Sequence, residues 1–279
     1  MERQIREKVT GFRTRDGAGV SLVRVLSNRT VESYDPILML DSFDSTNPED
    51  YIAGFPMHPH RGIETISYVY QGRMTHKDSL GHEDTIGDGE VQWMTAGSGI
   101  MHEETLPASD RMLGVQLWLN MSARDKMAPP AYHSIKNHEI EDIPFEGGKL
   151  RLLAGQYQGR QGYMGQYQPL DYYDIHLEPA ASLTLETDPD RSVMAFTLLG
   201  QAIIAGEKIQ EKTAVKLTQG DRLVIQAAEE KAQVLFMSSV KLGEPVAWGG
   251  PIVMNTAQEI KKAFEDLRRG TFLQRDIAY

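Results

Sequence analysis

Two short segments carry residue types that can hold a metal ion. Residues 58–60, which read HPH, and residues 102–104, which read HEE, each place two potential ligands two positions apart. Side chains at i and i+2 of a β-strand point to the same face and lie roughly 6.6 Å apart. If the two segments form neighbouring strands, four side chains converge on one mononuclear site: His58, His60, His102 and Glu104.

Three acidic residues near these histidines compete for the role of fourth ligand. Glu104 shares strand parity with the histidine two positions before it, whereas Glu103 should face the opposite side. Glu64 also has the parity of the first histidine pair, unless Gly62 hosts a bulge that shifts the strand by one residue. Parity therefore favours Glu104 over Glu103. It leaves Glu64 as an alternative ligand, or as a group that orients a histidine ring.

The composition limits both the ligands and the partners. The chain of 279 residues contains no cysteine, so disulfides and metal–thiolate sites are excluded and a metal must be held by histidine and carboxylate. A formal charge of −10 opposes contact with a phosphate backbone, so we expect no direct binding to nucleic acid. Charged residues at the start of the chain and the lack of a long apolar run predict a cytoplasmic protein without a membrane segment.

Short strands dominate the pattern that must position the histidines. β-Branched and aromatic residues fill 63–70, apolar and polar residues alternate over 115–119, and turns rich in glycine and aspartate separate such segments. This spacing is typical of an antiparallel barrel or sandwich. Near the end the period becomes helical, with a polar cap at Asn255 and Thr256, apolar residues from Ile260 to Leu267, and Gly270 as the terminator.

The second half of the sequence resembles the first half. Residues 86–93 (IGDGEVQW) have a counterpart in residues 217–224 (LTQGDRLV), and each segment is a turn that leads into a strand. This similarity predicts a duplicated barrel. The second half contains no His-x-His segment, and we expect the isolated His176 to be a hydrogen-bonded structural residue. The second barrel is therefore predicted to hold no metal.

Several sequence blocks resemble the pirin family of the cupin superfamily. They are HPHRG-x-ET at 58–65, DS-x-G at 78–81, VQWMTAG-x-GI-x-H-x-E at 91–104, and GGPIVMNT at 249–256 before the C-terminal helix. The resemblance spans nearly the whole chain. It implies an all-β bicupin fold, in which two antiparallel β-barrels of the jelly-roll type are followed by a short C-terminal helix.

From this resemblance we expect residues 1–133 to form an N-terminal barrel with the metal site. Residues 134–279 are expected to form a C-terminal barrel without metal, whose final helix packs back on the N-terminal domain. Pirins take their acidic ligand two residues after the last histidine, so the resemblance favours Glu104 over Glu64. It implies one divalent transition metal, with Fe(II) first and Mn, Co, Ni, Cu and Zn as alternatives.

The resemblance implies quercetin 2,3-dioxygenase activity. A flavonol or related phenolic substrate would meet O₂ at the metal, the heterocycle would open and carbon monoxide would leave. An alternative is an iron-binding, redox-sensing regulatory protein that acts through protein partners without obligatory catalysis, as animal pirins do. In a further alternative the metal only stabilises the fold.

Large apolar residues near the histidines have two interpretations. Phe55, Met74, Trp93 and Met101 are candidates for the apolar lining of a substrate pocket. Aromatic and methionine side chains in strands are nevertheless packing residues far more often than substrate contacts. We therefore predict no substrate-binding residue from the sequence.

Overall fold

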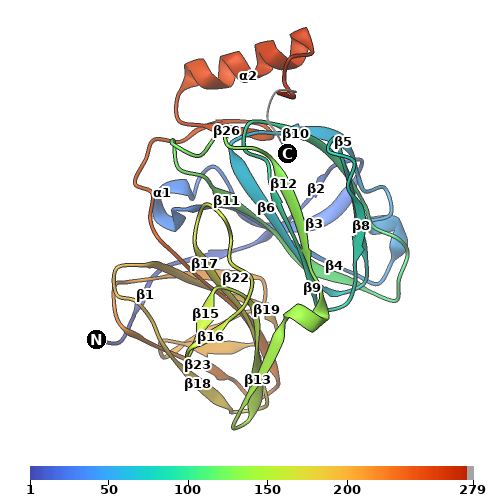
Figure 1. The fold of residues 1–279 in the computed structure, drawn as a ribbon. Helices are drawn as coiled ribbons and strands as arrows, with labels where there is room; N and C mark the ends of the chain where they lie inside the picture. Colours follow the sequence, from blue (N-terminus) through green and yellow to red (C-terminus); the bar gives the residue numbers. More distant parts are fainter. Residues whose placement is uncertain (275–279) are drawn as a thin grey trace. The chain divides into compact units, whose positions relative to one another are not determined.

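The structure of the protein is a computed structural model that describes residues 1–274 (Figure 1). Contacts between Cα atoms divide the chain into two compact units. The C-terminal unit comprises Met1–Phe12, Glu32–Pro36 and Asn137–Lys241, and the N-terminal unit comprises Arg13–Val31, Ile37–Lys136 and, among the described residues, 242–274. Antiparallel sheets build both units, which confirms the predicted all-β fold.

Two antiparallel sheets form most of the N-terminal unit. The larger has the strand order β12-β9-β6-β11-β4-β3-β2, and the smaller has the order β5-β10-β7-β8. The strands are β2 (Phe12–Asp16), β3 (Val20–Leu26), β4 (Ile37–Ser45), β5 (Phe55–His60), β6 (Ile63–Gln71), β7 (Met74–Asp78), β8 (Glu83–Ile86), β9 (Glu90–Thr95), β10 (Ile100–Thr105), β11 (Met112–Asn120) and β12 (Ala131–Ile135).

The alternating segment 115–119 lies in strand β11, as predicted, and this strand is at the centre of the larger sheet. Every residue of β11 is buried, and the strand pairs with β4 on one side and β6 on the other. Gly114 permits a close approach here, because a Cβ atom at this position would lie 2.4 Å from the carbonyl oxygen of Tyr68. The residues of β11 are therefore those of a central strand whose two faces are both covered.

The C-terminal unit repeats this architecture. Its larger sheet has the order β1-β22-β19-β24-β17-β14-β13, and its smaller sheet has the order β18-β23-β20-β21. The elements are β1 (Ile5–Thr10), α1 (Val31–Tyr34), β13 (Glu141–Phe145), β14 (Gly148–Ala154), β15 (Gln156–Tyr157), β16 (Arg160–Gln161), β17 (Leu170–Leu177), β18 (Ser182–Glu186), β19 (Ser192–Leu199), β20 (Ala202–Ile204), β21 (Glu207–Ile209), β22 (Thr213–Leu217), β23 (Arg222–Ala227) and β24 (Ala232–Ser239). The predicted duplication is confirmed.

The correspondence between the two halves differs from the one predicted. The order of the sheets makes β9 equivalent to β22 and β10 equivalent to β23. The turn within 217–224 joins β22 to β23, so its structural equivalent is the turn between β9 and β10, not the turn within 86–93. The proposed match was therefore shifted by one strand, because glycine-rich turns look alike wherever they connect two strands.

The C-terminal helix forms as its capping pattern predicted. In α2 (Ala257–Arg269) the side chain of Thr256 accepts a hydrogen bond from the backbone N–H of Glu259, and the Glu259 carboxylate accepts one from the backbone N–H of Thr256. Gly270 ends the helix in the left-handed conformation, with φ of 69°. No helix among residues 1–274 is long and apolar enough to cross a membrane.

A buried arginine ties this helix to the turn that follows β5. The guanidinium of Arg61 donates to the carbonyl of Ser98 at 2.7 Å, to Asp266 of α2 at 2.9 Å and to the carbonyl of Phe272 at 2.9 Å. The same guanidinium lies 4.2 Å from the centre of the Phe272 ring. All these contacts lie within the N-terminal unit.

A buried lysine holds the adjoining strand. The hairpin of β25 (Ala247–Gly249) and β26 (Ile252–Met254) precedes α2, which follows β26 in Figure 1. The ammonium of Lys126 donates to the carbonyls of Val253 in β26 and of Gly62. Gly62 has φ of 79°, and a Cβ atom there would lie 2.0 Å from the carbonyl oxygen of Val253, so this contact requires glycine.

We predict that Asp266→Ala destabilises the N-terminal unit by about 3 kcal/mol, because the buried Arg61 guanidinium loses its carboxylate partner. Tryptophan fluorescence during urea unfolding measures this effect selectively. All three tryptophans of the chain, Trp93, Trp118 and Trp248, belong to this unit.

The matched control is Lys262→Ala. Lys262 also pairs with Asp266, but its side chain is 68% exposed, so its removal should change the stability by less than about 1 kcal/mol. Equal urea midpoints for the two variants would show that the buried pair does not stabilise the unit.

Candidate metal centre

The two histidine segments lie on adjacent strands, as predicted. Strands β5 and β10 pair in antiparallel register, with His102 opposite His58 and Ile100 opposite His60. The register shifts between His102 and Glu104, so a bulge interrupts the pairing just before the acidic residue.

The rings of the three histidines converge. The ligand atoms of His58, His60 and His102 all lie within 4.8 Å of one another. The ring centres are 4.3 Å apart for His58 and His102, and 5.0 Å apart for His60 and His102. The structure therefore brings together three of the four side chains that strand parity selected.

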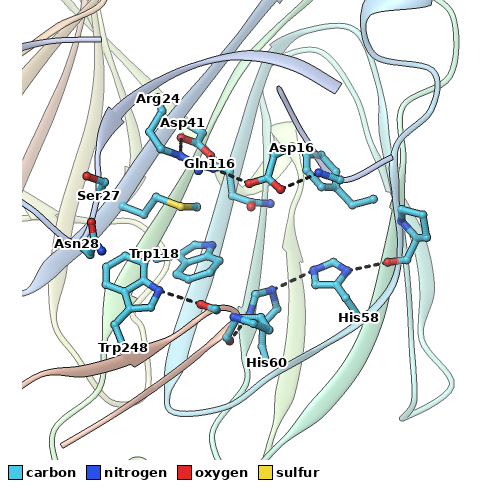
Figure 2. Close-up of a pocket in the computed structure, with 16 residues that line it drawn as sticks. Asp16, Arg24, Ser27, Asn28, Asp41, His58, His60, Gln116, Trp118 and Trp248 are labelled. Atoms are coloured by element: carbon cyan, nitrogen blue, oxygen red, sulfur yellow. Dashed lines mark hydrogen bonds and ion pairs between the residues drawn. The ribbon is translucent and has the colours of Figure 1, made fainter. Parts of the chain in front are cut away.

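Backbone carbonyls fix the tautomers of two of these rings. The Nδ1 atom of His58 lies 2.8 Å from the carbonyl oxygen of Pro56, and that of His60 lies 2.8 Å from the carbonyl oxygen of Pro251. A carbonyl only accepts, so each Nδ1 carries a hydrogen and each Nε2 keeps its lone pair. The two Nε2 atoms are 3.1 Å apart (Figure 2). Two lone pairs at this distance repel each other unless a cation lies between them.

The third ring completes the same arrangement. His102 is buried, and its Nε2 has no hydrogen-bond partner among residues 1–274. Burial, with a contribution from the neighbouring His58, lowers the pKa of His60 to about 3, and burial likewise lowers the pKa of His102 well below its usual value. Both rings are thus held neutral, which is the form that binds metals. A buried unpartnered nitrogen beside two facing lone pairs fits a divalent transition metal.

Glu104 lies close to the histidines but outside their group. Its carboxylate is buried and accepts hydrogen bonds from the side-chain amide of Gln116, the shorter at 2.9 Å, and from the amide of Gln92. These two glutamines come from the larger sheet, on β11 and β9. The role of Glu104 as the fourth ligand stays a prediction.

The rival acid belongs to a different hydrogen-bond set. Glu64 lies on β6, and its carboxylate accepts from the indole N–H of Trp93 at 3.0 Å and from the hydroxyl of Thr95 at 2.7 Å. The chain enters this strand through Gly62, whose left-handed φ of 79° separates β5 from β6. The parity argument that coupled Glu64 to His60 does not hold, because the two residues lie on different strands.

The equivalent strands of the C-terminal unit place aliphatic residues in the core. In the order of the sheets, β18 and β23 correspond to β5 and β10. Their core-facing pairs are Leu183 opposite Ile225 and Leu185 opposite Leu223. His176 is hydrogen-bonded, as expected, with its Nε2 2.7 Å from a carboxylate oxygen of Asp174.

A cavity of about 670 Å³ opens beside the histidines. His58, His60 and Trp248 line one side of it in Figure 2, and Asp16, Arg24 and Asp41 line the other. Trp118 and Trp248 stack with ring centres 5.5 Å apart, and Trp118 meets the His60 ring edge to face at 5.0 Å. The apolar part of the cavity can therefore hold a flat aromatic molecule.

On the polar side of the cavity, an arginine is already paired with two acidic side chains. The guanidinium of Arg24 donates to both oxygens of Asp41, at 2.9 and 2.7 Å, and to Asp16 at 2.6 Å. One cation is thus shared by two carboxylates. Hydrogen bonds and the charge of Arg24 lower the pKa of Asp16 against the opposing effect of its burial, so Asp16 is a carboxylate that accepts hydrogen bonds.

The structure revises the candidate pocket lining. Of the four residues considered, only Phe55 lines the cavity, while Met74 and Trp93 are buried in the core and Met101 is not among the lining residues. Trp118 and Trp248 were missed. Trp118 lies on the same face of β11 as Gln116, but only the structure shows that this face lines the cavity. Trp248 follows β5 by almost 190 residues, and no local pattern connects it to the site.

The comparisons with known proteins agree with this architecture. The family model described as Pirin matches residues 19–119, and the model of the pirin C-terminal cupin domain matches residues 172–273. The chain belongs to the pirin family. This pirin chain is 39% identical over 276 residues to a pirin-like protein of Caulobacter vibrioides, with 97% of this chain and 99% of the relative covered. It is 33% identical over 272 residues to a pirin-like protein of Solanum lycopersicum, with 96% and 92% covered.

A crystal structure has the same fold as this pirin throughout. The quercetin 2,3-dioxygenase from Acinetobacter baumannii superposes with a TM-score of 0.90 at 32% identity, covering 98% of this chain and 99% of that chain. The resemblance inferred from the histidine blocks is therefore confirmed, and so is the fold that it implied.

We predict that the pirin chain binds one divalent metal ion per molecule, as measured by elemental analysis after loading with Co(II) and by calorimetric titration. Replacement of any one of His58, His60 and His102 by alanine should weaken binding by about tenfold or more, because even groups that only support a ligand contribute this much.

The choice between the two acids can be tested in the same titration. Glu104→Gln should weaken metal binding by at least about tenfold, whereas the matched variant Glu64→Gln should leave it within a factor of about three of the wild type. The reverse ranking would assign the acidic ligand to Glu64.

Proposed function

We propose that this protein is a metal-dependent dioxygenase that cleaves a flavonol or a related phenolic compound with O₂. The observation that carries the proposal is the convergence of the ligand atoms of His58, His60 and His102 beside a cavity that is lined by two of these histidines and by two tryptophans. The activity named for the Acinetobacter baumannii structure, at 32% identity, supports the reaction class.

His58, His60 and His102 would hold the metal, with Glu104 as the fourth ligand. Fe(II) is the proposed ion, and Mn, Co, Ni, Cu and Zn are the alternatives for this ligand set. When bound, a redox-active ion with open coordination positions supplies a place where a phenolate oxygen and O₂ are held together for reaction.

The residues of the cavity would bind and orient the substrate. Trp118 and Trp248, stacked on each other, would form an apolar aromatic wall that a planar ring can pack against and from which it excludes water. A volume of about 670 Å³ lies within the range of pockets for small organic ligands, roughly 300–1,000 Å³. The rings of His60 and Trp118 are 5.0 Å apart, so a planar ring packed on this wall would lie beside the ligand cluster.

The polar side of the cavity would favour hydroxyl groups over anionic groups. Asp16 accepts hydrogen bonds, and Arg24 is already paired with two carboxylates. No other lysine or arginine is among the residues that line the cavity in the described part of the chain. A neutral polyhydroxylated arene therefore fits this lining better than a carboxylate or a sulfate ester does.

We predict that the Fe(II)-loaded protein consumes O₂ in the presence of quercetin, with loss of the flavonol absorbance and release of one carbon monoxide per O₂ consumed. An oxygen electrode and headspace gas analysis measure the stoichiometry. If the protein shows no oxygen uptake with any of the six metals, the proposed activity is wrong, and stoichiometric metal binding without turnover would favour the regulatory alternative.

The role of the tryptophan wall has its own variant. Trp248→Ala should raise KM for quercetin about tenfold, because roughly 1.4 kcal/mol of stacking and burial is lost. Phe12→Ala removes an aromatic side chain that is 58% exposed and does not line the cavity, so it should leave KM unchanged.

A further inference from the structure

His102 differs from the other two histidines in what holds its second ring nitrogen. The Nδ1 atoms of His58 and His60 face backbone carbonyls, whereas Nδ1 of His102 lies 3.3 Å from Nδ1 of His76 on β7. Strands β7 and β10 are paired, with Glu104 opposite His76 and His102 opposite Asp78. This register places the two rings diagonally on one face of the sheet.

The contact continues from His76 toward the surface. Nε2 of His76 lies 2.9 Å from Oδ2 of Asp78, and the same oxygen lies 3.0 Å from Nδ1 of His82. His76 and the Asp78 side chain are completely buried, while the side chain of His82 is 44% exposed. The ring of Tyr132 stacks on His76 with centres 4.2 Å apart and planes 11° apart, which fixes the orientation of that ring.

Asp78 is held as an acceptor on both of its oxygens. Oδ1 accepts from the backbone N–H of Leu80 at 2.8 Å and of His82 at 3.1 Å, and Oδ2 faces the two imidazoles. Burial alone would raise the pKa of Asp78, but the hydrogen bonds from His76 and His82 lower it below its ordinary value. Asp78 is therefore a carboxylate, and every group in contact with it must donate.

This requirement determines which ring nitrogen of His76 and which ring nitrogen of His102 carries a hydrogen. Because Asp78 only accepts, Nε2 of His76 carries a hydrogen, and in the neutral form of that ring Nδ1 is then an acceptor. Nδ1 of His102 must then donate to His76, and Nε2 of His102 keeps its lone pair. We propose that His76 and Asp78 are positioning residues that fix His102 in the tautomer whose Nε2 can bind a metal. The proposal rests on the metal site proposed above.

The support behind His102 differs from that behind the other two rings. His58 and His60 face the peptide carbonyls of Pro56 and Pro251, whereas His102 reaches the Asp78 carboxylate through the ring of His76. Groups that support a metal-binding histidine contribute about 10- to 100-fold to metal affinity.

The variant Asp78→Asn tests this tautomer control. The two backbone N–H groups at Oδ1 cannot change, so the amide oxygen of asparagine must face them and its NH₂ group must face the imidazoles. His76 must then accept at Nε2 and carry its hydrogen at Nδ1. This hydrogen points at His102, whose own hydrogen must move to Nε2, where it blocks the metal. We expect Co(II) affinity, measured by calorimetry, to fall about 10- to 100-fold.

Two further variants separate tautomer control from a merely structural role. Asp78→Ala leaves a polar space in which water can accept from His76, so it should lower Co(II) affinity less than Asp78→Asn, although it removes more of the side chain. Asp174→Asn is the matched control, because Asp174 is also buried and paired with a histidine, His176, in the C-terminal unit. It should leave Co(II) affinity unchanged.

Nitrogen-15 NMR of histidine-labelled, metal-free protein provides a readout that requires neither metal nor activity. The wild type should show His102 with its hydrogen on Nδ1, and Asp78→Asn should show it on Nε2. A wild-type spectrum with the hydrogen on Nε2, or equal Co(II) affinity in wild type and Asp78→Asn, would overturn the inference. If the wild type bound no metal while its NMR spectrum showed the expected tautomer, the metal site would fail and the tautomer control would stand.

Discussion

The pairing of β5 with β10 is the interaction on which the site depends. It places His58 opposite His102, and the alternation along β5 adds His60 to the same face. Side chains from two adjacent strands thus converge without any loop having to adopt a special conformation. Once the rings are there, each nitrogen aimed at the cluster is useful only if the other nitrogen of its ring carries the hydrogen. The hydrogen-bond partners behind the rings therefore matter as much as the rings themselves.

These partners come from distant parts of the chain, which explains why the N-terminal unit includes the C-terminal segment. Pro251 orients His60 across 191 positions of sequence, and Trp248 forms part of the cavity wall. The buried Arg61, next to His60, fixes this segment through Asp266 of α2. The helix thus contributes to the site through a chain of buried polar contacts, although none of its residues lines the cavity.

The features that the sequence predicted are those with a local period. Strand parity selected His58, His60 and His102. The cap at Thr256 and the terminator Gly270 located the helix. Both kinds of signal depend only on residues that are close together in the sequence. The expected parity of Glu64 with the first histidine pair does not hold, because the left-handed Gly62 separates β5 from β6. Contacts such as those of Pro251 with His60, or of His76 with His102, depend on which strands become neighbours, and a single sequence does not contain that information. The two halves were matched one strand out of step, because glycine-rich turns look alike wherever they connect two strands.

The duplicated unit shows what the histidines cost and why they are retained. The C-terminal unit builds the same two sheets in the same order, with Leu183, Leu185, Leu223 and Ile225 on the strands equivalent to β5 and β10. The architecture therefore does not need polar residues at this place, and aliphatic ones pack into a continuous core. In the N-terminal unit the same strand pair buries imidazole nitrogens whose lone pairs face one another, which is unfavourable without a ligand. The same fold can fill this place with leucine and isoleucine, yet the N-terminal unit keeps three converging imidazoles there. This choice lowers the stability of the unit in exchange for a binding site.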